Sequence, residues 1–185
     1  LRLLVISVWG EAQIRAWKDA ASPGGALSGY IVRLQGLYNR IEALPQVTFC
    51  EIGGAAMGGG YELALACDFR MAADEARIAL PEVSLGLIPG AGGTQRLTRL
   101  CGPGIAKRII LGCEPVDGKT ALALGMVQWS VPRAELPEQA QQTCDRLAAL
   151  PSHAQAMAKQ CIGLYGEVTA QGYGQEMTVG GALLD

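Results

Sequence analysis

Blocks of apolar residues along the chain predict strands that alternate with helices in the first half. From Ile31 to Ile41 the apolar residues recur at spacings of three and four, which is typical of an amphipathic helix over 29–44. Pro45 then ends this helix. Shorter apolar runs bounded by glycine, proline or aspartate are predicted as strands. The predicted strands are 1–8, 47–52, 69–73, 77–80 and 126–131.

Helices dominate the second half of the chain. Gly102-Pro103-Gly104 is expected to break a helical stretch, and Asp117 is the predicted N-cap of a helix over 118–124. The remaining predicted helices are 12–21, 95–100, 105–111, 135–149 and 152–165, with a helix-like tail over 167–184. This order indicates the α/β class with a helical C-terminal region. The chain has no internal repeat or linker-like stretch, so we expect one domain.

Composition narrows the class of protein. Half of the 185 residues are hydrophobic and 17% are charged, which predicts that some surface is buried in an oligomer. The net charge of −2 and the lack of a basic run argue against nucleic-acid binding. No apolar run is long enough to span a bilayer, and the first strand is not followed by a signal-peptide cleavage pattern. The six cysteines form no C-x-x-C pair and the chain has one histidine, so we predict reduced thiols and no zinc site.

Three consecutive glycines, Gly58 to Gly60, lead directly into an apolar stretch that is predicted as a helix. Glycine lets a ligand approach the backbone closely, and the first N–H groups of a helix are unpaired and partially positive. We therefore predict an oxyanion site here, with Glu62 beside it as a proton carrier. The alternative interpretation is a glycine-rich turn with an exposed glutamate.

The glycine clusters do not fit a nucleotide motif. A G-x-G-x-x-G pattern that begins at Gly58 reaches Leu63 at its third glycine position, and one that begins at Gly90 reaches Gln95. The chain also has no P-loop and no G-x-S-x-G elbow. His153 follows Pro151 at a predicted helix start, and we expect it on the surface.

A second carboxylate, Glu82, lies 20 residues after Glu62 and follows Pro81. If the intervening helix, strand and turn fold back, both side chains reach one pocket. Two carboxylates beside an oxyanion hole suit chemistry at the α and β carbons of a thioester, where one activates water and the other protonates carbon. The alternative is that Glu82 is an exposed charge at the end of a strand.

Two segments carry a family resemblance. Residues 54–68 (GAAMGGGYELALACD) and 81–97 (PEVSLGLIPGAGGTQRL) closely resemble the signatures of the crotonase (enoyl-CoA hydratase/isomerase) superfamily, most like its enoyl-CoA hydratases. The resemblance implies a spiral of ββα units over 1–131 and a helical region over 132–185 that takes part in oligomerisation. It also implies a trimer or a dimer of trimers. Relative to the family, the chain is expected to lack the first strands and the end of the last helix.

The resemblance assigns roles to particular residues. Gly59 corresponds to one backbone donor of the oxyanion hole that holds the thioester carbonyl. The segment Ala16-Trp17-Lys18-Asp19 takes the place of the family's A-G-x-D element, which makes Lys18 the candidate second donor, with Trp17 where glycine is expected. Glu62 would activate water and Glu82 would protonate the α carbon. Gly58 and Gly90 are the candidate substrate-binding glycines.

The implied activity is hydration of a trans-2-enoyl-CoA to a 3-hydroxyacyl-CoA, as in fatty-acid β-oxidation or branched amino-acid breakdown. The resemblance implies no metal and no cofactor beyond the coenzyme A of the substrate. Two alternatives stay open: an acyl-CoA-binding or assembly protein with weak or no catalysis, which the altered 16–19 segment motivates, and an enoyl-CoA isomerase. The implied compartment is the bacterial cytoplasm or the mitochondrial matrix, and the acyl-chain length is open.

Overall fold

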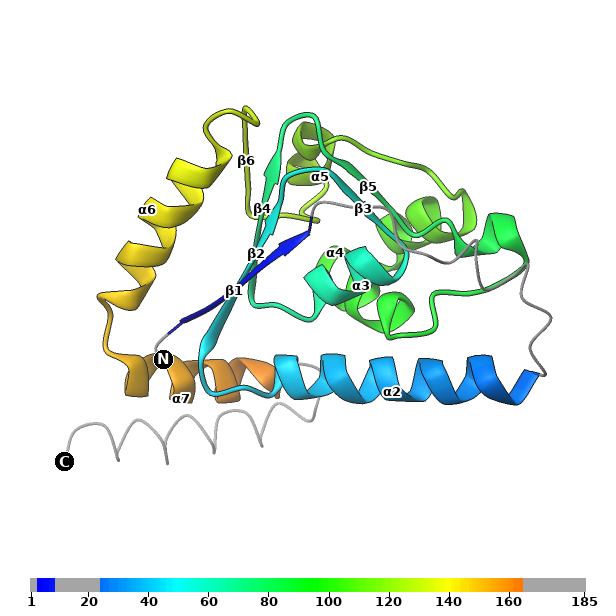
Figure 1. Cartoon of the computed structure of the whole chain (residues 1–185), viewed down its shortest axis with the longest axis horizontal. Helices are drawn as coiled ribbons and strands as arrows, with labels where there is room; N and C mark the ends of the chain where they lie inside the picture. The colour runs from blue at the N-terminus through cyan, green and yellow to red at the C-terminus, as the bar shows by residue number, and fades with distance from the viewer. Residues whose placement is uncertain (1–2, 9–23, 165–185) are drawn as a thin grey trace.

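The computed structural model describes residues 3–8 and 24–164, with side chains from residue 29 onward. Its centre is a four-stranded parallel sheet in the order β1-β2-β4-β6 (Figure 1). A second sheet pairs β3 with β5, also in parallel. The strands are β1 (Leu3–Val8), β2 (Val47–Ile52), β3 (Ala55–Met57), β4 (Phe69–Ala73), β5 (Arg77–Ala79) and β6 (Trp129–Val131). Phe49, Ile52 and Met71 are fully buried, as expected for parallel strands that are covered on both faces.

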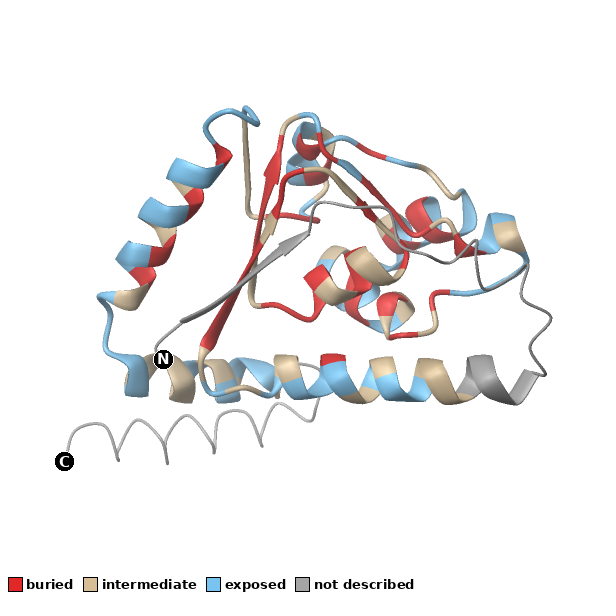
Figure 2. Cartoon of the chain, in the orientation of Figure 1, coloured by how far each residue is buried: buried red, intermediate tan, exposed pale blue. Residues whose placement is uncertain are grey.

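Helices cover both faces of the four-stranded sheet. Figure 1 shows α6 on one side and α3 and α4 on the other. Figure 2 shows that the buried residues of α6 face the sheet while its outer face is exposed. The helical elements are α2 (Gly24–Glu42), α3 (Gly59–Leu65), the 3-10 helix η1 (Glu82–Leu85), α4 (Gly93–Leu111), α5 (Gly118–Ala123), α6 (Leu136–Ala148) and α7 (Ser152–Gly163). None of the helices in these ranges is long and apolar enough to cross a membrane.

The element order confirms the expected ββα units. β2 in the large sheet is followed by β3 in the small sheet and then by α3. β4 and β5 repeat this alternation between the sheets, and η1 and α4 follow them. Each turn of the chain thus places one strand in each sheet and then a helix. This spiral positions the N-terminus of α3 beside the end of β5, where the Gly58 N–H donates to the Ala79 carbonyl at 3.0 Å.

Several predicted boundaries are confirmed. β2 and β4 match the predicted strands, and the Asp117 side chain caps α5 by accepting from the Thr120 N–H at 2.7 Å. The Gly102-Pro103-Gly104 break appears as a kink inside α4, where Gly102 has φ 79° and ψ 165°.

Other boundaries were wrong. α2 begins at Gly24 instead of 29, and β6 covers only 129–131 of the predicted 126–131. Met126 and Val127 are buried without belonging to the strand, so an apolar run overstates its length. β3 and η1 were not predicted, because three or four residues are too few to show a period. The predicted segments 12–21 and 167–184 lie outside the described residues.

Candidate active site

The glycine run forms the N-terminus of α3. Gly58 has φ 53° and ψ −125°, a backbone conformation that glycine adopts without strain, and it serves as the N-cap. Its own N–H is occupied by the Ala79 carbonyl. By contrast, within the part of the chain that the structure describes, no acceptor takes the N–H of Gly59. Gly59 therefore has an N–H free to bind a ligand at the start of α3.

Tyr38 of α2 holds the same turn from the opposite side. Its hydroxyl donates to the Gly59 carbonyl at 3.0 Å. Burial, followed by the charge of Glu62, raises the pKa of Tyr38 to about 12, so the phenol stays protonated and keeps donating at neutral pH. The hydrogen bond fixes the peptide that follows the Gly59 N–H.

Glu62 lies in the first turn of α3 and is only 3% exposed, so the interpretation of an exposed glutamate is wrong. Its Oε1 accepts two backbone N–H groups, from Ala91 and from Gly93, each at 2.8 Å. Burial raises the pKa of Glu62, while these two hydrogen bonds and the charge of Arg96 act in the opposite direction. The carboxylate is therefore held by the glycine-rich loop that precedes α4.

The shape of this loop depends on close packing. A Cβ on Gly93 would lie 3.0 Å from both Cγ and Oε1 of Glu62 and 3.0 Å from Cβ of Pro89. Gly92 has φ 108°, a left-handed conformation that favours glycine. Two consecutive glycines thus let the backbone turn and approach the carboxylate at hydrogen-bonding distance.

Arg96 braces the loop against α2. Its Nη1 donates to the Ala91 carbonyl at 3.0 Å, its Nε to Oε2 of Glu42 at 2.9 Å, and its Nη2 to Oδ1 of Asn39 at 2.7 Å. Arg96 is 7% exposed and its bond to Ala91 is buried, whereas Asn39 and Glu42 hold the other side of the guanidinium nearer the surface. The guanidinium therefore connects α2 to the same residue, Ala91, whose N–H binds Glu62.

Glu82 begins η1 and is 4% exposed, so the interpretation of an exposed strand-end charge is also wrong. Its Oε2 is buried and has no hydrogen-bond partner among the described residues. Burial is the largest cause that raises the pKa of Glu82 to about 7, and the charge of Glu62 raises it further. The two carboxyl groups are thus close enough to interact electrostatically.

The structure also places the remaining predicted residues. The Gly90 carbonyl accepts from Nε2 of Gln35 at 2.6 Å, and a Cβ on Gly90 would lie 3.1 Å from Cγ2 of Ile31, so α2 packs on this glycine. Lys18 lies outside the described residues. His153 is exposed, as expected. No group of three or more histidine, cysteine, aspartate or glutamate side chains that could hold a metal ion occurs in the described ranges.

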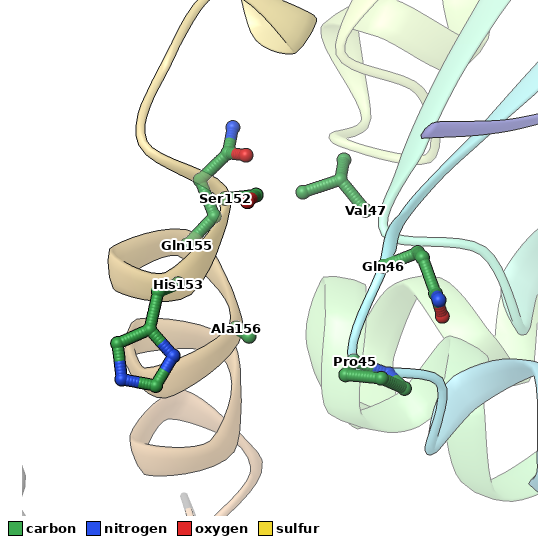
Figure 3. A pocket seen from close by; sticks show the side chains of 7 residues that line it. All are labelled: Pro45, Gln46, Val47, Ser152, His153, Gln155 and Ala156. Carbon is green, nitrogen blue, oxygen red and sulfur yellow. The ribbon is translucent and has the colours of Figure 1, made fainter. Parts of the chain in front are cut away.

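Figure 3 shows a separate cavity of about 260 Å³ between the start of α7 and the start of β2. Its lining residues are Pro45, Gln46, Val47, Ser152, His153, Gln155 and Ala156. In this view the His153 imidazole points away from Pro45 and Val47. The lining contains no carboxylate, so this cavity offers no counterpart to the Glu62–Glu82 pair.

Sequence reasoning missed the residues that brace the site: Tyr38, Arg96 and Gln35. Tyr38 belonged to the apolar face of a predicted amphipathic helix, where an aromatic residue indicates core packing. Arg96 lies within the 81–97 segment that carries the family resemblance, and the sequence predicts no separate role for it. The signal that was available is the pair Gly92-Gly93 immediately before a helix, which indicates a close approach of backbone to a partner.

Comparison with known proteins agrees with this fold. The family model for enoyl-CoA hydratase/isomerase matches residues 26–176. The chain belongs to this family.

Individual relatives extend the comparison. A probable enoyl-CoA hydratase of Bacillus subtilis is 52% identical over 95 residues, which cover 51% of this chain and 37% of that protein. A crotonyl-CoA hydratase of Syntrophomonas wolfei is 39% identical over 149 residues, covering 75% of this chain and 55% of that protein. The crystal structure of an enoyl-CoA hydratase from Bacillus anthracis superimposes with a TM-score of 0.91 at 33% identity, over 99% of this chain and 73% of that one. The chain spans about half the length of these curated relatives or less.

Proposed function

We propose that the protein hydrates trans-2-enoyl-CoA thioesters to 3-hydroxyacyl-CoA thioesters, as a member of a fatty-acid or branched amino-acid breakdown route. The observation that carries the proposal is the contrast within one buried carboxylate pair. Oε1 of Glu62 is held by two N–H groups, whereas the pKa of Glu82 is raised to about 7 and its Oε2 is unpaired. Hydration needs one carboxylate to activate water and one carboxylic acid to protonate carbon.

Glu62 fits the role of the base. The Ala91 and Gly93 N–H groups both bind Oε1, so they orient the carboxylate without using Oε2. In the proposed mechanism Oε2 takes a proton from the water that adds to the β carbon. Glu82, half protonated near neutral pH, then delivers a proton to the α carbon. The two roles match the two environments. Burial raises the pKa of Glu62, but its two loop N–H groups favour the charged form, whereas Oε2 of Glu82 is unpaired and the pKa of Glu82 is raised to about 7.

The thioester carbonyl needs donors for the charge that develops on its oxygen. The unpaired Gly59 N–H at the start of α3 is the proposed first donor, and the Lys18 N–H the proposed second. Gly58 and Gly90 are proposed to leave room for the acyl-CoA beside the backbone. The proposed reaction uses no metal and no cofactor apart from the coenzyme A of the substrate.

The test is the loss of enoyl-thioester absorbance when the protein is mixed with crotonyl-CoA. Glu62→Gln and Glu82→Gln are each expected to lower kcat by about 10²–10⁴-fold, the usual contribution of a positioned acid or base. Glutamine keeps a carbonyl oxygen for the two loop N–H groups, so the fold is preserved. Glu114→Gln, which changes an exposed partner of Arg108, is the matched control and is expected to leave turnover unchanged.

Each other outcome has a definite meaning. Turnover that survives Glu62→Gln but not Glu82→Gln points to an isomerase that uses one carboxylate. Binding of a CoA ester without turnover points to a binding or assembly protein. Equal turnover of the wild type and both variants overturns the proposed site.

We also propose that the protein works as a trimer or a dimer of trimers, with the 132–185 region at the contacts. Several large apolar side chains are exposed on the described chain and support burial by other copies: Val32, Ile88, Leu111 and Ile162 are 63–73% exposed. Light scattering after size exclusion tests this, and a monomer would contradict it. Bacterial and mitochondrial proteins both occur among the relatives, which supports the bacterial cytoplasm or the mitochondrial matrix as the proposed compartment.

A further inference from the structure

Successive peptide groups of the loop before α4 bind two different side chains. The N–H groups of Ala91 and Gly93 donate to Oε1 of Glu62, each at 2.8 Å. The carbonyl of Ala91, which belongs to the peptide between these two donors, instead accepts from Nη1 of Arg96 at 3.0 Å. The carboxylate and the guanidinium are therefore bound by adjacent peptide groups of one short loop.

Gly92 leaves the space that the Arg96 guanidinium fills. A Cβ on Gly92 would overlap with Nη1 of Arg96, so the guanidinium lies directly against this glycine. Gly92 also has φ 108°, and its carbonyl accepts the backbone N–H of Arg96 at 2.9 Å. Arg96 thus contacts the residue that lies between the two backbone donors to Glu62.

Arg96 is itself held by α2. Its Nη2 donates to Oδ1 of Asn39 at 2.7 Å, and its Nε donates to Oε2 of Glu42 at 2.9 Å. Asn39 and Glu42 are three residues apart, so they lie on one face of the helix. Ala91 of the loop belongs to a small buried cluster with Tyr38 of the same helix. Polar and apolar contacts with α2 together fix where the guanidinium lies.

The charges around Glu62 differ in sign. Among the described residues, Glu62 interacts electrostatically with Tyr38 of α2, Glu82 of η1 and Arg96 of α4, and of these Arg96 is the positively charged group. Burial has the largest effect on the pKa of Glu62 and raises it, whereas the two loop hydrogen bonds and then the charge of Arg96 lower it. The influences that favour the carboxylate form therefore come from Arg96 and from the loop that it holds.

We propose that Arg96 is a positioning residue for the hydration: it holds the two backbone donors against Glu62 and keeps the carboxylate charged and oriented for the incoming water. Arg96 acts through the Ala91 carbonyl and through its charge, and it does not touch the reacting atoms. The inference rests on the proposed function, in which Glu62 takes the proton from water.

Arg99, about one turn further along α4, offers a matched control. Its Nη1 pairs with Oε1 of Glu42 at 3.3 Å, so it shares an acidic partner with Arg96. However, the Arg99 side chain is 50% exposed, and its charge is not among those that shift the pKa of Glu62. Replacing either arginine with methionine removes one positive charge. Of the two, only Arg96 contacts the loop, through Ala91.

The first measurement follows the titration of Glu62 without substrate, by NMR of protein labelled at the glutamate carboxyl carbon. The background is Glu82→Gln, so that only one carboxyl group of the interacting pair titrates. The Glu62 signal is identified by its loss in Glu62→Gln. Arg96→Met is expected to raise the midpoint of this titration by about one pH unit, because a nearby opposite charge is lost. Arg99→Met is expected to leave the midpoint unchanged.

The second measurement is the hydration of crotonyl-CoA. Arg96→Met is expected to lower kcat about tenfold with little change in KM, because a misplaced base affects the transition state and not substrate binding. The acid side of its kcat/KM profile should move to higher pH. Arg96→Lys should restore the acid side but only part of kcat, since an ammonium lacks the planar fork that binds Ala91, Asn39 and Glu42 together. Arg99→Met should match the wild type.

The two measurements separate this inference from the proposed function. A wild type without turnover overturns the proposed function, and a raised midpoint in Arg96→Met would then still support Arg96 as the residue that holds Glu62. An unmoved midpoint in Arg96→Met overturns the inference even if kcat falls, because a lower kcat alone reflects a loss of structure.

If Arg96→Met does not fold, Glu42→Gln decides the question. Glutamine keeps an oxygen acceptor for Nε of Arg96 and removes the negative charge that opposes the guanidinium. The midpoint of Glu62 should therefore fall relative to Glu114→Gln, which removes the same charge from an exposed ion pair. Equal midpoints in these two variants would overturn the proposal.

Discussion

Glu62 and Glu82 are almost equally buried, yet their surroundings differ. Glu62 lies in the first turn of α3 and accepts two backbone N–H groups from the loop before α4. Glu82 lies in η1 with one carboxylate oxygen unpaired and a pKa raised to about 7. Burial alone therefore does not decide the chemistry of a carboxylate. The hydrogen bonds that accompany burial give the two carboxyl groups different environments, which is why we propose Glu62 as the base and Glu82 as the acid.

The surroundings of Glu62 and Glu82 differ because the glycine-rich loop before α4 donates hydrogen bonds to Glu62 in α3 but not to Oε2 of Glu82 in η1. Gly93 lets the loop backbone reach Glu62, and Arg96 holds the loop in place from α2. No comparable donor reaches Oε2 of Glu82 from the described residues. The following predictions test whether these contacts cause the difference.

Among changes to the residues around the two carboxylates, the largest effect is expected from Gly93→Ala. The new Cβ would lie 3.0 Å from Cγ and Oε1 of Glu62, so the carboxylate must shift by a few tenths of an ångström. We expect kcat/KM for crotonyl-CoA to fall by about 10–10²-fold, because a small misplacement of a catalytic group is costly. Gly104→Ala on the same helix meets nothing within 4 Å and is the control. Equal activity of the two variants would contradict the role of the loop.

The pH dependence of kcat/KM tests the assignment of Glu82 as the acid. Its pKa of about 7 means that the protonated form is lost as the pH rises through 7. We expect kcat/KM for hydration to fall by about tenfold for each pH unit well above 7. A profile that stays flat to pH 9 would show that a protonated Glu82 is not required.

The cost of burying Glu82 is expected to appear in the stability of the protein. A carboxyl group whose pKa is raised in the folded state stabilises the fold below the ordinary pKa of 4.5, and this contribution is lost as the pH rises to about 7. Relative to Glu82→Gln, the wild type should lose on the order of 2 kcal/mol in its free energy of unfolding between pH 4.5 and pH 8. Urea unfolding at both pH values measures this loss.

Glu114→Gln serves as the control for that experiment, because the hydrogen bond and charge of Arg108 lower the pKa of Glu114, whereas the pKa of Glu82 is raised. The wild type and this variant should therefore keep a constant difference from pH 5 to pH 8. If the difference in free energy of unfolding between the wild type and Glu82→Gln also stays constant over this range, the pKa of Glu82 is not raised.

The smallest effect is expected from Tyr38→Phe, which removes the hydrogen bond to the Gly59 carbonyl. We expect a loss of about 1 kcal/mol in stability and a decrease of about two- to fivefold in kcat. Tyr61→Phe removes a similar bond, to the Met126 carbonyl in the core, and should reduce stability without changing kcat. Similar kcat values for both variants would show that Tyr38 does not position the Gly59 turn.

The sequence by itself determined the long elements and the chemistry-bearing segment. Apolar periodicity predicted α2, and short apolar runs predicted β2 and β4, whose residues are almost all buried. The order of Gly58 to Gly60 and Glu62 predicted an unpaired N–H and a carboxylate in one helical turn, because both follow from the local geometry of a helix start. The segment 81–97 supplied Glu82 as the second carboxylate beside Glu62. Together with segment 54–68 it carried the resemblance to the family.

Only the tertiary structure decided how each carboxylate is paired. The N–H groups that bind Glu62 come from Ala91 and Gly93, 29 and 31 residues further along the chain. The residues that hold this loop, Arg96 and Gln35, act across α2 and α4. Such contacts depend on how the ββα units are stacked, which no local pattern encodes.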